Sequence, residues 1–231
     1  MYLDNAVTLA NFAYMKTALV FGATGQTGEQ LTDLLLNDDR YSTVKLFVRK
    51  PTGKQHSKLQ EVVNPLTDIN SIHNEIINGD VFCCIGTTIA KAGSQAAFTK
   101  VDYELPLAIA KAAAANGIET MITITALGAN AKSTNFYLRT KGEVEHDIIQ
   151  QGIANTVFVR PSLLLGDRKE FRLGERISKS IVALINPLFM GKLKHYKAIH
   201  SRTVAKAMIN LANDGKTGVR YVENEDLFDI G

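Results

Sequence analysis

A glycine-rich turn joins the first apolar segment of the chain to the first helical pattern. It reads Gly-Ala-Thr-Gly-Gln-Thr-Gly over residues 22–28 and follows Leu-Val-Phe directly. Gly22 permits a tight turn out of a strand, Gly25 leaves room for a ligand against the backbone, and Gly28 lets the next helix approach the sheet. The free N–H groups and the positive dipole end of that helix attract phosphate. The run therefore predicts a strand–turn–helix unit that binds a dinucleotide, although its G-x-x-G-x-x-G spacing differs from the usual G-x-G-x-x-G.

Strand and helix patterns alternate along most of the 231 residues. We expect strands at 17–21, 44–48, 61–64, 81–85, 121–125, 156–159 and 221–222, and helices at 26–36, 69–77, 95–116, 136–150 and 203–213. Such alternation is typical of βαβ units with right-handed crossovers. The predicted fold class is α/β, with a doubly wound, mostly parallel sheet. The length predicts one domain over residues 16–231, preceded by an N-terminal extension at 1–15.

Residues 166–202 interrupt the alternation. They hold nine lysines and arginines against three acidic residues, together with a group of apolar residues between 177 and 190. Three interpretations stay open: a lid over an anionic substrate, a solvated basic face above a packed helix, or a surface for a membrane or a protein partner. We take the first, a small C-terminal segment that covers the substrate.

Composition excludes several classes of protein. The net charge of +3 and the absence of tryptophan do not indicate nucleic-acid binding. No apolar run approaches the roughly 18 residues that a membrane-spanning helix needs. The five histidines are scattered and show no metal-ligand spacing. We expect no nucleic-acid partner, no integral membrane segment and no metal.

The two cysteines are adjacent, Cys83 and Cys84, inside a predicted strand. Neighbours in a strand point to opposite faces, so a disulfide framework is excluded and a reduced setting fits. The first 15 residues lack the basic start and long apolar core of a secretory signal. We therefore expect a cytoplasmic protein.

Tyr137 and Lys141 are four residues apart in a predicted helix, so their side chains share one face. A nearby ammonium favours a phenolate, and such a tyrosine can exchange a proton with a carbonyl or alcohol oxygen. The lysine can also hold the ribose hydroxyls of a dinucleotide. The pair follows the predicted strand 121–125 at the edge of the sheet where ligands of this fold bind. The alternative is an exposed helix pair without a role.

Thr125 ends that strand, and its hydroxyl is a candidate to bind a substrate carbonyl and Tyr137 together. The alternative is an ordinary β-branched strand residue.

Two basic residues, Arg49 and Lys50, end the second predicted strand. An NAD enzyme usually carries an acidic residue there for the ribose 2′-hydroxyl, whereas a cation suits the 2′-phosphate of NADP. We therefore expect NADP(H) as the cofactor. Gly86, Thr87 and Thr88, after the fourth strand, are expected under the dinucleotide, and Arg160 at its nicotinamide end; either group is equally compatible with ordinary loop chemistry.

These motifs together resemble the short-chain dehydrogenase/reductase superfamily, most closely its atypical branch of NAD(P)-binding proteins related to the Tat-interacting protein oxidoreductases. The similarity covers residues 16–231 and rests on four segments in the same order. The segments are Gly22-Ala-Thr-Gly-Gln-Thr-Gly, the region from Cys83-Cys-Ile-Gly-Thr-Thr to Val101-Asp-Tyr, Tyr137-Leu-Arg-Thr-Lys-Gly-Glu-Val-Glu, and Arg160-Pro-Ser-Leu-Leu-Leu-Gly. The resemblance implies a Rossmann-type fold and NADPH bound by the loop that includes Thr24, Gln26 and Thr27. It also implies an active-site pair at Tyr137 and Lys141.

The chain departs from the family at Thr125, where serine is common. Some relatives bind the dinucleotide and a protein partner as redox-sensing regulators. The expected function is an NADPH-dependent oxidoreductase that reduces a small carbonyl compound, as a monomer or homodimer, with Tyr137, Lys141 and Thr125 as catalytic residues. The alternatives are a non-catalytic NADP(H)-sensing regulatory protein and, less favoured, a nucleotide-sugar epimerase or isomerase.

Overall fold

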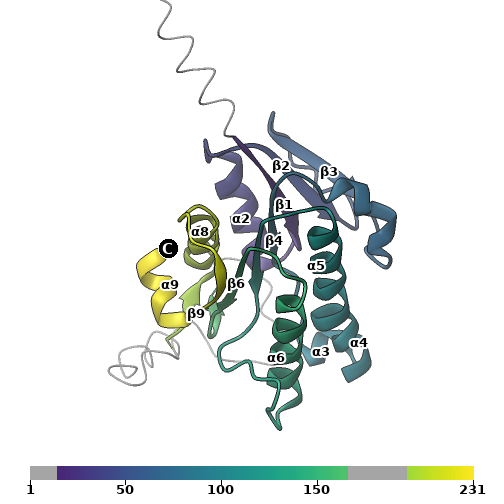
Figure 1. Ribbon diagram of the computed structural model, residues 1–231, viewed down its shortest axis with the longest axis vertical. Helices are drawn as coiled ribbons and strands as arrows, with labels where there is room; N and C mark the ends of the chain where they lie inside the picture. Colours follow the sequence, from purple (N-terminus) through teal and green to yellow (C-terminus); the bar gives the residue numbers. More distant parts are fainter. Residues whose placement is uncertain (1–14, 166–196) are drawn as a thin grey trace, which may run out of the picture.

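A parallel sheet runs through the centre of the part of the protein that the computed structural model describes, residues 15–165 and 197–231. Within these residues, seven strands pair in the order β3-β2-β1-β4-β5-β6-β9, and every pair is parallel (Figure 1). Their bounds are Lys16–Phe21 (β1), Tyr41–Val48 (β2), Leu59–Val63 (β3), Asp80–Cys83 (β4), Thr120–Ile124 (β5), Asn155–Arg160 (β6) and Gly218–Glu223 (β9). The order reverses between β1 and β4, which is where ligands bind in sheets of this kind.

Helices cover both faces of the sheet (Figure 1). One face packs against α2 (Gln26–Leu36), α8 (Ser201–Ala212) and α9 (Asn224–Ile230), and its core includes Leu31 and Met208. The other face packs against η1 (Ile69–Glu75), α5 (Leu105–Ala115) and α6 (Phe136–Ile149), and its core includes Ile109 and Ile148. The two layers confirm the predicted doubly wound α/β fold, and α2 has the bounds that the sequence predicts.

The long helix expected at 95–116 is not uniform. It begins as α4 (Gln95–Thr99), widens into the π-helical turn η2 (Lys100–Glu104) and continues as α5. Pro106 explains the change, because its ring lacks an N–H group and clashes with the carbonyl four residues earlier. The N–H of Leu105 instead donates to the carbonyl of Lys100, five residues back. Turns of this kind frequently occur at functional sites.

Several short elements were not predicted. They are α3 (Ile89–Ala92), the C-terminal helix α9, and a parallel pair formed by β7 (Leu164–Leu165) and β8 (Ile199–His200). The buried side chain of Asn224 accepts a hydrogen bond from the N–H of Ser162 (2.9 Å) and donates one to the carbonyl of Lys197 (2.8 Å). These contacts hold Ser162 and Lys197 next to the start of α9.

Two predictions fall on residues outside the described ranges. The N-terminal extension lies almost wholly within 1–14, and most of the predicted substrate-covering segment lies within 166–196. Both stay predictions.

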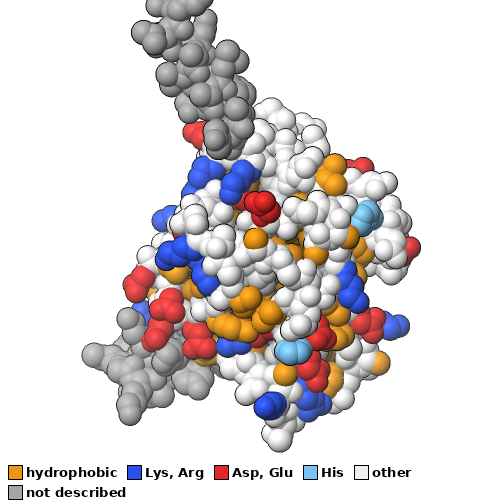
Figure 2. All heavy atoms as spheres, in the orientation of Figure 1, with side chains coloured by type: hydrophobic (Ala, Val, Ile, Leu, Met, Phe, Trp, Pro, Cys, Tyr) orange, Lys and Arg blue, Asp and Glu red, His pale blue; other side chains and the backbone are white. Residues whose placement is uncertain are grey.

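Charged side chains of both signs are interspersed on the face of the molecule that Figure 2 shows. Across the described ranges, no helix combines the length and apolar character needed to span a bilayer.

Candidate active site

The glycine-rich turn packs against its own backbone and against the end of β4. Gly22 has φ +79°, and a Cβ added there would lie 2.7 Å from the carbonyl carbon of Cys84. A Cβ added to Gly28 would lie 2.1 Å from the carbonyl oxygen of Gly22, so only glycine lets α2 start this close to β1. Gly25 donates its N–H to the same oxygen at 2.9 Å. The turn thus places the N-terminus of α2 at the switch point between β1 and β4.

The start of α2 has unpaired hydrogen-bonding groups. Its N-cap residue, Gly25, supplies no side-chain cap. Within the described residues, the side-chain amide nitrogen of Gln26 and the hydroxyl of Thr27 are buried and have no partner. Buried donors without partners are costly, and a helix N-terminus attracts anions. The turn therefore fits the diphosphate of a dinucleotide, with Gln26 and Thr27 as side-chain donors and Thr24 exposed beside them.

Replacing Gly28 by alanine is expected to lower the free energy of unfolding by about 1–3 kcal/mol, because backbone must move to admit the methyl group. NADPH affinity should fall with it. The matched variant is Gly25→Ala, whose Cβ would lie 3.2 Å from the Gly22 carbonyl oxygen and requires only a small adjustment. It should remain close to wild type in stability and still bind NADPH poorly. Urea unfolding and calorimetry measure both effects, and a Gly28→Ala protein as stable as the wild type would contradict the prediction.

Arg49 and Lys50 are exposed immediately after β2, and their side chains make no hydrogen bond or ion pair with any other described residue. The carboxyl end of β2 adjoins that of β1, so both cations lie near the glycine-rich turn. Their chemistry suits a 2′-phosphate, and their role in cofactor choice stays a prediction.

The turn after β4 holds Gly86, Thr87 and Thr88, each in a different contact. The N–H of Thr87 donates to Oδ2 of Asp102 at 3.0 Å. The hydroxyl of Thr88 accepts from the N–H of Lys91 at 3.2 Å and so caps α3. A Cβ on the exposed Gly86 would lie 3.4 Å from Oδ1 of Asp102 and 3.6 Å from Nζ of Lys141. The turn after β4 thereby meets the lysine of the predicted catalytic pair.

Tyr137 and Lys141 lie on α6, as predicted. The side chain of Asn135 caps this helix by accepting from the N–H of Leu138 at 3.2 Å. Tyr137 is half-buried, with its ring centroid 5.5 Å from that of the buried Phe98. Lys141 is almost fully buried. Gly142 allows the loop before the helix to cross closely, since a Cβ there would lie 2.1 Å from the nitrogen of Ala131.

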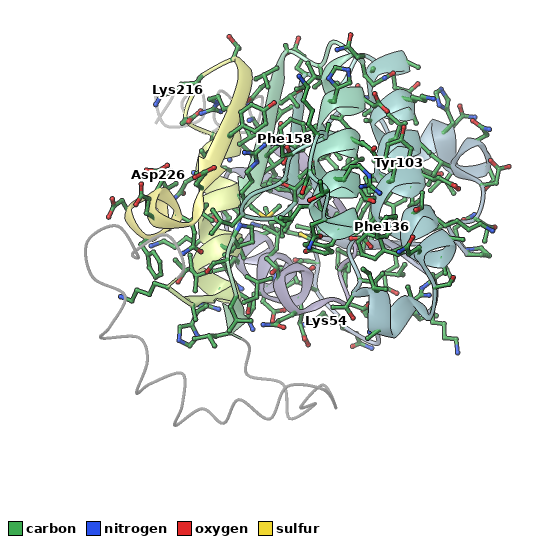
Figure 3. The ribbon with its side chains drawn as sticks, turned by 90° about the horizontal axis from the view of Figure 1, so that it is seen from below. Lys54, Tyr103, Phe136, Phe158, Lys216 and Asp226 are labelled. Atoms are coloured by element: carbon green, nitrogen blue, oxygen red, sulfur yellow. The ribbon has the colours of Figure 1, made fainter. Side chains whose placement is uncertain are left out.

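Asp102 holds the ammonium of Lys141. The two side chains form an ion pair, with Nζ 2.7 Å from Oδ1, and their exposed fractions are 5% and 0%. Asp102 belongs to η2, so the widened turn aims this carboxylate at α6. The next residue, Tyr103, is bonded to Asp147 of the same helix. Figure 3 labels Tyr103 and Phe136 on this side of the molecule, where η2 and α6 pack together.

Burial raises the pKa of Asp102 above its ordinary value of 3.8. Attraction from Lys141 and the N–H of Thr87 oppose this effect without cancelling it. The raised pKa means that this carboxyl group holds its proton more tightly in the folded protein than in the unfolded chain.

Thr125 makes a different contact from the one expected. Its hydroxyl donates to Oε1 of Glu145 at 2.5 Å, and both residues are buried. Arg160 binds the same carboxylate through both arms, with Nε 3.0 Å from Oε1 and Nη2 2.5 Å from Oε2. The guanidinium also lies over the Tyr221 ring, 4.3 Å from its centroid. The Thr125 proton is directed at Glu145 and is therefore not available to a carbonyl. Arg160 is bonded to Glu145, and its cofactor role stays a prediction.

Asp102 and Glu145 are the site residues that the sequence prediction missed. Glu145 lies four residues after Lys141, the same spacing that separates Lys141 from Tyr137, and this repeat was a usable signal. Asp102 lies in the quoted segment Val101-Asp-Tyr, but its contact with Lys141 could not be predicted, because its position depends on the π-helical turn. Within the described residues no cluster of histidine, cysteine or acidic side chains could hold a metal ion.

A family profile described as NAD(P)H-binding matches residues 22–215, which include the turn, Asp102 and the Tyr137–Lys141 pair. The chain belongs to this NAD(P)H-binding family. Among similar proteins of the family is Protein FMP52, mitochondrial, from Candida albicans, 34% identical over 208 residues that cover 87% of this chain and 90% of that protein. Another is Protein HTATIP2 from Rattus norvegicus, 29% identical over 94% of this chain and 89% of that protein. These matches confirm the resemblance to atypical short-chain dehydrogenases.

Solved structures of other proteins have the same fold as this chain. The UDP-N-acetylglucosamine 4-epimerase from Methanobrevibacter ruminantium M1, in complex with UDP-N-acetylmuramic acid, superposes with a TM-score of 0.68. It covers 90% of this chain and 76% of that one at 18% identity. This likeness confirms the Rossmann-type fold and says nothing about the reaction.

The expectation of a cytoplasmic protein is wrong. Four similar FMP52 proteins of the family, from four yeasts, carry the description mitochondrial. The expectation rested on reduced cysteines and the lack of a secretory signal, and neither feature separates cytoplasm from mitochondrion.

Proposed function

We propose that this protein is an NADPH-dependent reductase of small carbonyl compounds. The observation that carries the proposal is the convergence at one sheet edge of a phosphate-binding turn and a Tyr–Lys pair. Lys141 lies against Gly86, in the turn after β4, and the backbone of Cys84, which directly follows β4, lies against Gly22. A cofactor that spans the switch point therefore reaches Lys141 from the N-terminus of α2.

Each group of residues in the proposed site has a separate role. The start of α2 and the Gly22–Gly28 turn hold the diphosphate, and Arg49 with Lys50 hold the 2′-phosphate. NADPH, when bound, supplies the hydride. Tyr137 donates a proton to the substrate oxygen, and the Lys141 ammonium favours loss of that proton and binds ribose hydroxyls. Asp102 keeps the ammonium in place through their 2.7 Å contact.

The decisive experiment combines binding with turnover. Calorimetry with NADPH tests the cofactor site, and absorbance at the NADPH band, followed with a panel of aldehydes, ketones and quinones, tests reduction. We expect saturable NADPH binding and oxidation of NADPH with at least one carbonyl class. NADPH binding without turnover on any of them would overturn the reductase proposal and leave the cofactor site standing.

Arg49→Ala is expected to weaken NADPH binding about tenfold and to leave NADH binding unchanged, since it removes a charged hydrogen bond to the 2′-phosphate. The control is Lys45→Ala, which removes a positive charge from the same strand. The Lys45 ammonium pairs with Glu75 at 2.8 Å and belongs to another part of the surface. Calorimetry with both dinucleotides checks this, and an unchanged preference in Arg49→Ala would count against the NADP assignment.

A second function is a dinucleotide-sensing regulatory protein without turnover. The contact of Thr125 with Glu145 favours it, because the site then lacks the hydroxyl donor expected for a substrate carbonyl. The same assay separates the two functions. An epimerase or isomerase has only the likeness of fold in its favour and is not proposed.

The names of the FMP52 relatives support a mitochondrial location. Immunoblotting of isolated mitochondria from the source cells tests it.

We also propose that residues 166–202 cover the substrate. Variants that lack this segment and still bind NADPH provide the test.

A further inference from the structure

Tyr137 lies in the first turn of α6, and its hydroxyl makes no hydrogen bond with another described residue. Its ring instead contacts the ring of Phe98 in α4, with the two centroids 5.5 Å apart. We propose that Phe98 is a positioning residue for Tyr137, because its ring fixes the direction in which the phenol points toward the substrate oxygen. The inference rests on the proposed function, since it adds a residue to the same reaction.

The place of Tyr137 in its helix leaves the side chain without support from a preceding turn. Helical side chains lean back over the turn that precedes their own Cα. For Tyr137 no such turn exists, because α6 begins only one residue earlier, at Phe136. A catalytic group must be held within about 0.5 Å and 10–20° of its productive geometry. The half-buried Tyr137 therefore depends on a neighbouring element for its orientation.

Phe98 is placed to give this support. Among the described residues it is fully buried, yet it belongs to neither of the two cores that pack against the sheet. Its ring meets that of Tyr137 at an interplanar angle of 48°, and lies 5.7 Å from that of Phe136 at an angle of 61°. Both separations lie in the range in which aromatic rings attract each other. Phe98 thus packs against the two aromatic residues that open α6.

The helical run that carries Phe98 contacts both members of the proposed catalytic pair. Ser94 caps the start of α4, and its carbonyl accepts from the N–H of Phe98 at 3.0 Å. Four residues after Phe98, in η2, Asp102 forms the ion pair with Lys141. The same spacing of four separates Tyr137 from Lys141. One run of helix therefore meets the pair at two matching positions, an aromatic ring against the phenol and a carboxylate against the ammonium.

The test replaces the ring of Phe98 by aliphatic side chains. Phe98→Leu leaves the Tyr137 ring free to tilt, and Phe98→Met fills the space with a flexible chain. Each variant should lower kcat for carbonyl reduction by about 10²-fold, the cost of a displacement of about 1 Å at a catalytic group. KM for the carbonyl compound and NADPH affinity should stay close to wild type.

The matched control is Phe82→Leu. Phe82 is also fully buried and contacts a tyrosine, since its ring centroid lies 6.0 Å from that of Tyr41. It belongs to the core on the face of the sheet that packs against α2 and α8, opposite α6. Phe82→Leu should lower the free energy of unfolding as Phe98→Leu does, because both leave a cavity, and should keep its turnover.

A merely structural effect of Phe98 is recognised by repeating Phe98→Leu in the Tyr137→Phe background. If Phe98 acts through the phenol, its replacement should cost nothing further in kcat once the phenol is absent. A general loss of the fold or of cofactor binding would lower the residual rate in both backgrounds alike.

Fluorine NMR of protein labelled with 3-fluorotyrosine gives a second measurement that does not depend on turnover. The Tyr137 signal is identified by its absence from Tyr137→Phe. It should shift in Phe98→Leu, where the neighbouring ring is lost, and keep its position in Phe82→Leu.

A wild-type kcat in Phe98→Leu or Phe98→Met would overturn the inference, as would an equal loss in the two backgrounds or an unmoved Tyr137 signal. If Phe98→Leu does not fold, Phe98→Met decides. A wild type without turnover ends the proposed function, and this inference with it. Normal turnover in the Phe98 variants, beside an active wild type, ends only the role given to Phe98.

Discussion

Tyr137→Phe is expected to lower the rate of carbonyl reduction by about 10²- to 10⁴-fold, the range found when a positioned general acid is lost. The phenylalanine ring preserves the packing against Phe98, so the fold and NADPH affinity should stay close to wild type. Turnover with the best substrate of the carbonyl panel and calorimetry with NADPH measure the two quantities.

The matched control is Tyr103→Phe. Tyr103 belongs to η2, and its hydroxyl is bonded to Asp147 of α6. This variant should reduce turnover little. Equal rates for Tyr137→Phe and the wild type would show that Tyr137 is not the proton donor. Another residue would then have to be the acid of the reductase.

Asp102→Asn should lower both activity and stability. The substitution leaves the Lys141 ammonium without its partner at 2.7 Å, and a displacement of about 1 Å at a catalytic group can cost on the order of 10²-fold in rate. Turnover and NADPH affinity should both fall. The free energy of unfolding at neutral pH should also fall, because the Lys141 ammonium stays buried without a charge of opposite sign.

The raised pKa of Asp102 also predicts how the free energy of unfolding depends on pH. A carboxyl group whose pKa is higher in the folded state holds its proton longer than in the unfolded chain. Its contribution to stability is therefore complete below 3.8 and declines as the pH rises from 3.8 toward the raised value. Asp102→Asn lacks this decline, so urea unfolding at several pH values should show the variant gaining on the wild type as the pH rises. A variant with normal turnover, or one whose stability relative to the wild type does not change with pH, would contradict this interpretation of the pair.

Sequence patterns predicted the features that depend on residues close together in the chain. The glycine-rich turn, the bounds of α2, and the placement of Tyr137 and Lys141 on one helix depend on residues within a few positions of one another. The doubly wound, mostly parallel sheet was predicted from alternation and crossover handedness. Pro106 was a readable warning that 95–116 would not form a regular helix, since a proline inside a helix removes a hydrogen bond.

The partners of the site residues could not be predicted in the same way. Asp102 reaches Lys141 from 39 positions earlier in the chain, and only the combination of the π-helical turn with the packing of α6 brings them together. Thr125 was predicted to bind a substrate carbonyl, yet its proton is directed at Glu145 of α6. Contacts of this kind depend on tertiary packing, which periodicity does not encode.

The position of β1 has a consequence for how the protein is made. Among the seven strands of the described sheet, β1 comes first in the chain and occupies an inner place, with β2 on one side and β4 on the other. Each later strand of the seven then adds outside those already present, first toward β3 and afterwards toward β9. This sheet can grow in the order of synthesis, without opening a pair that has formed, and β9 closes one outer edge.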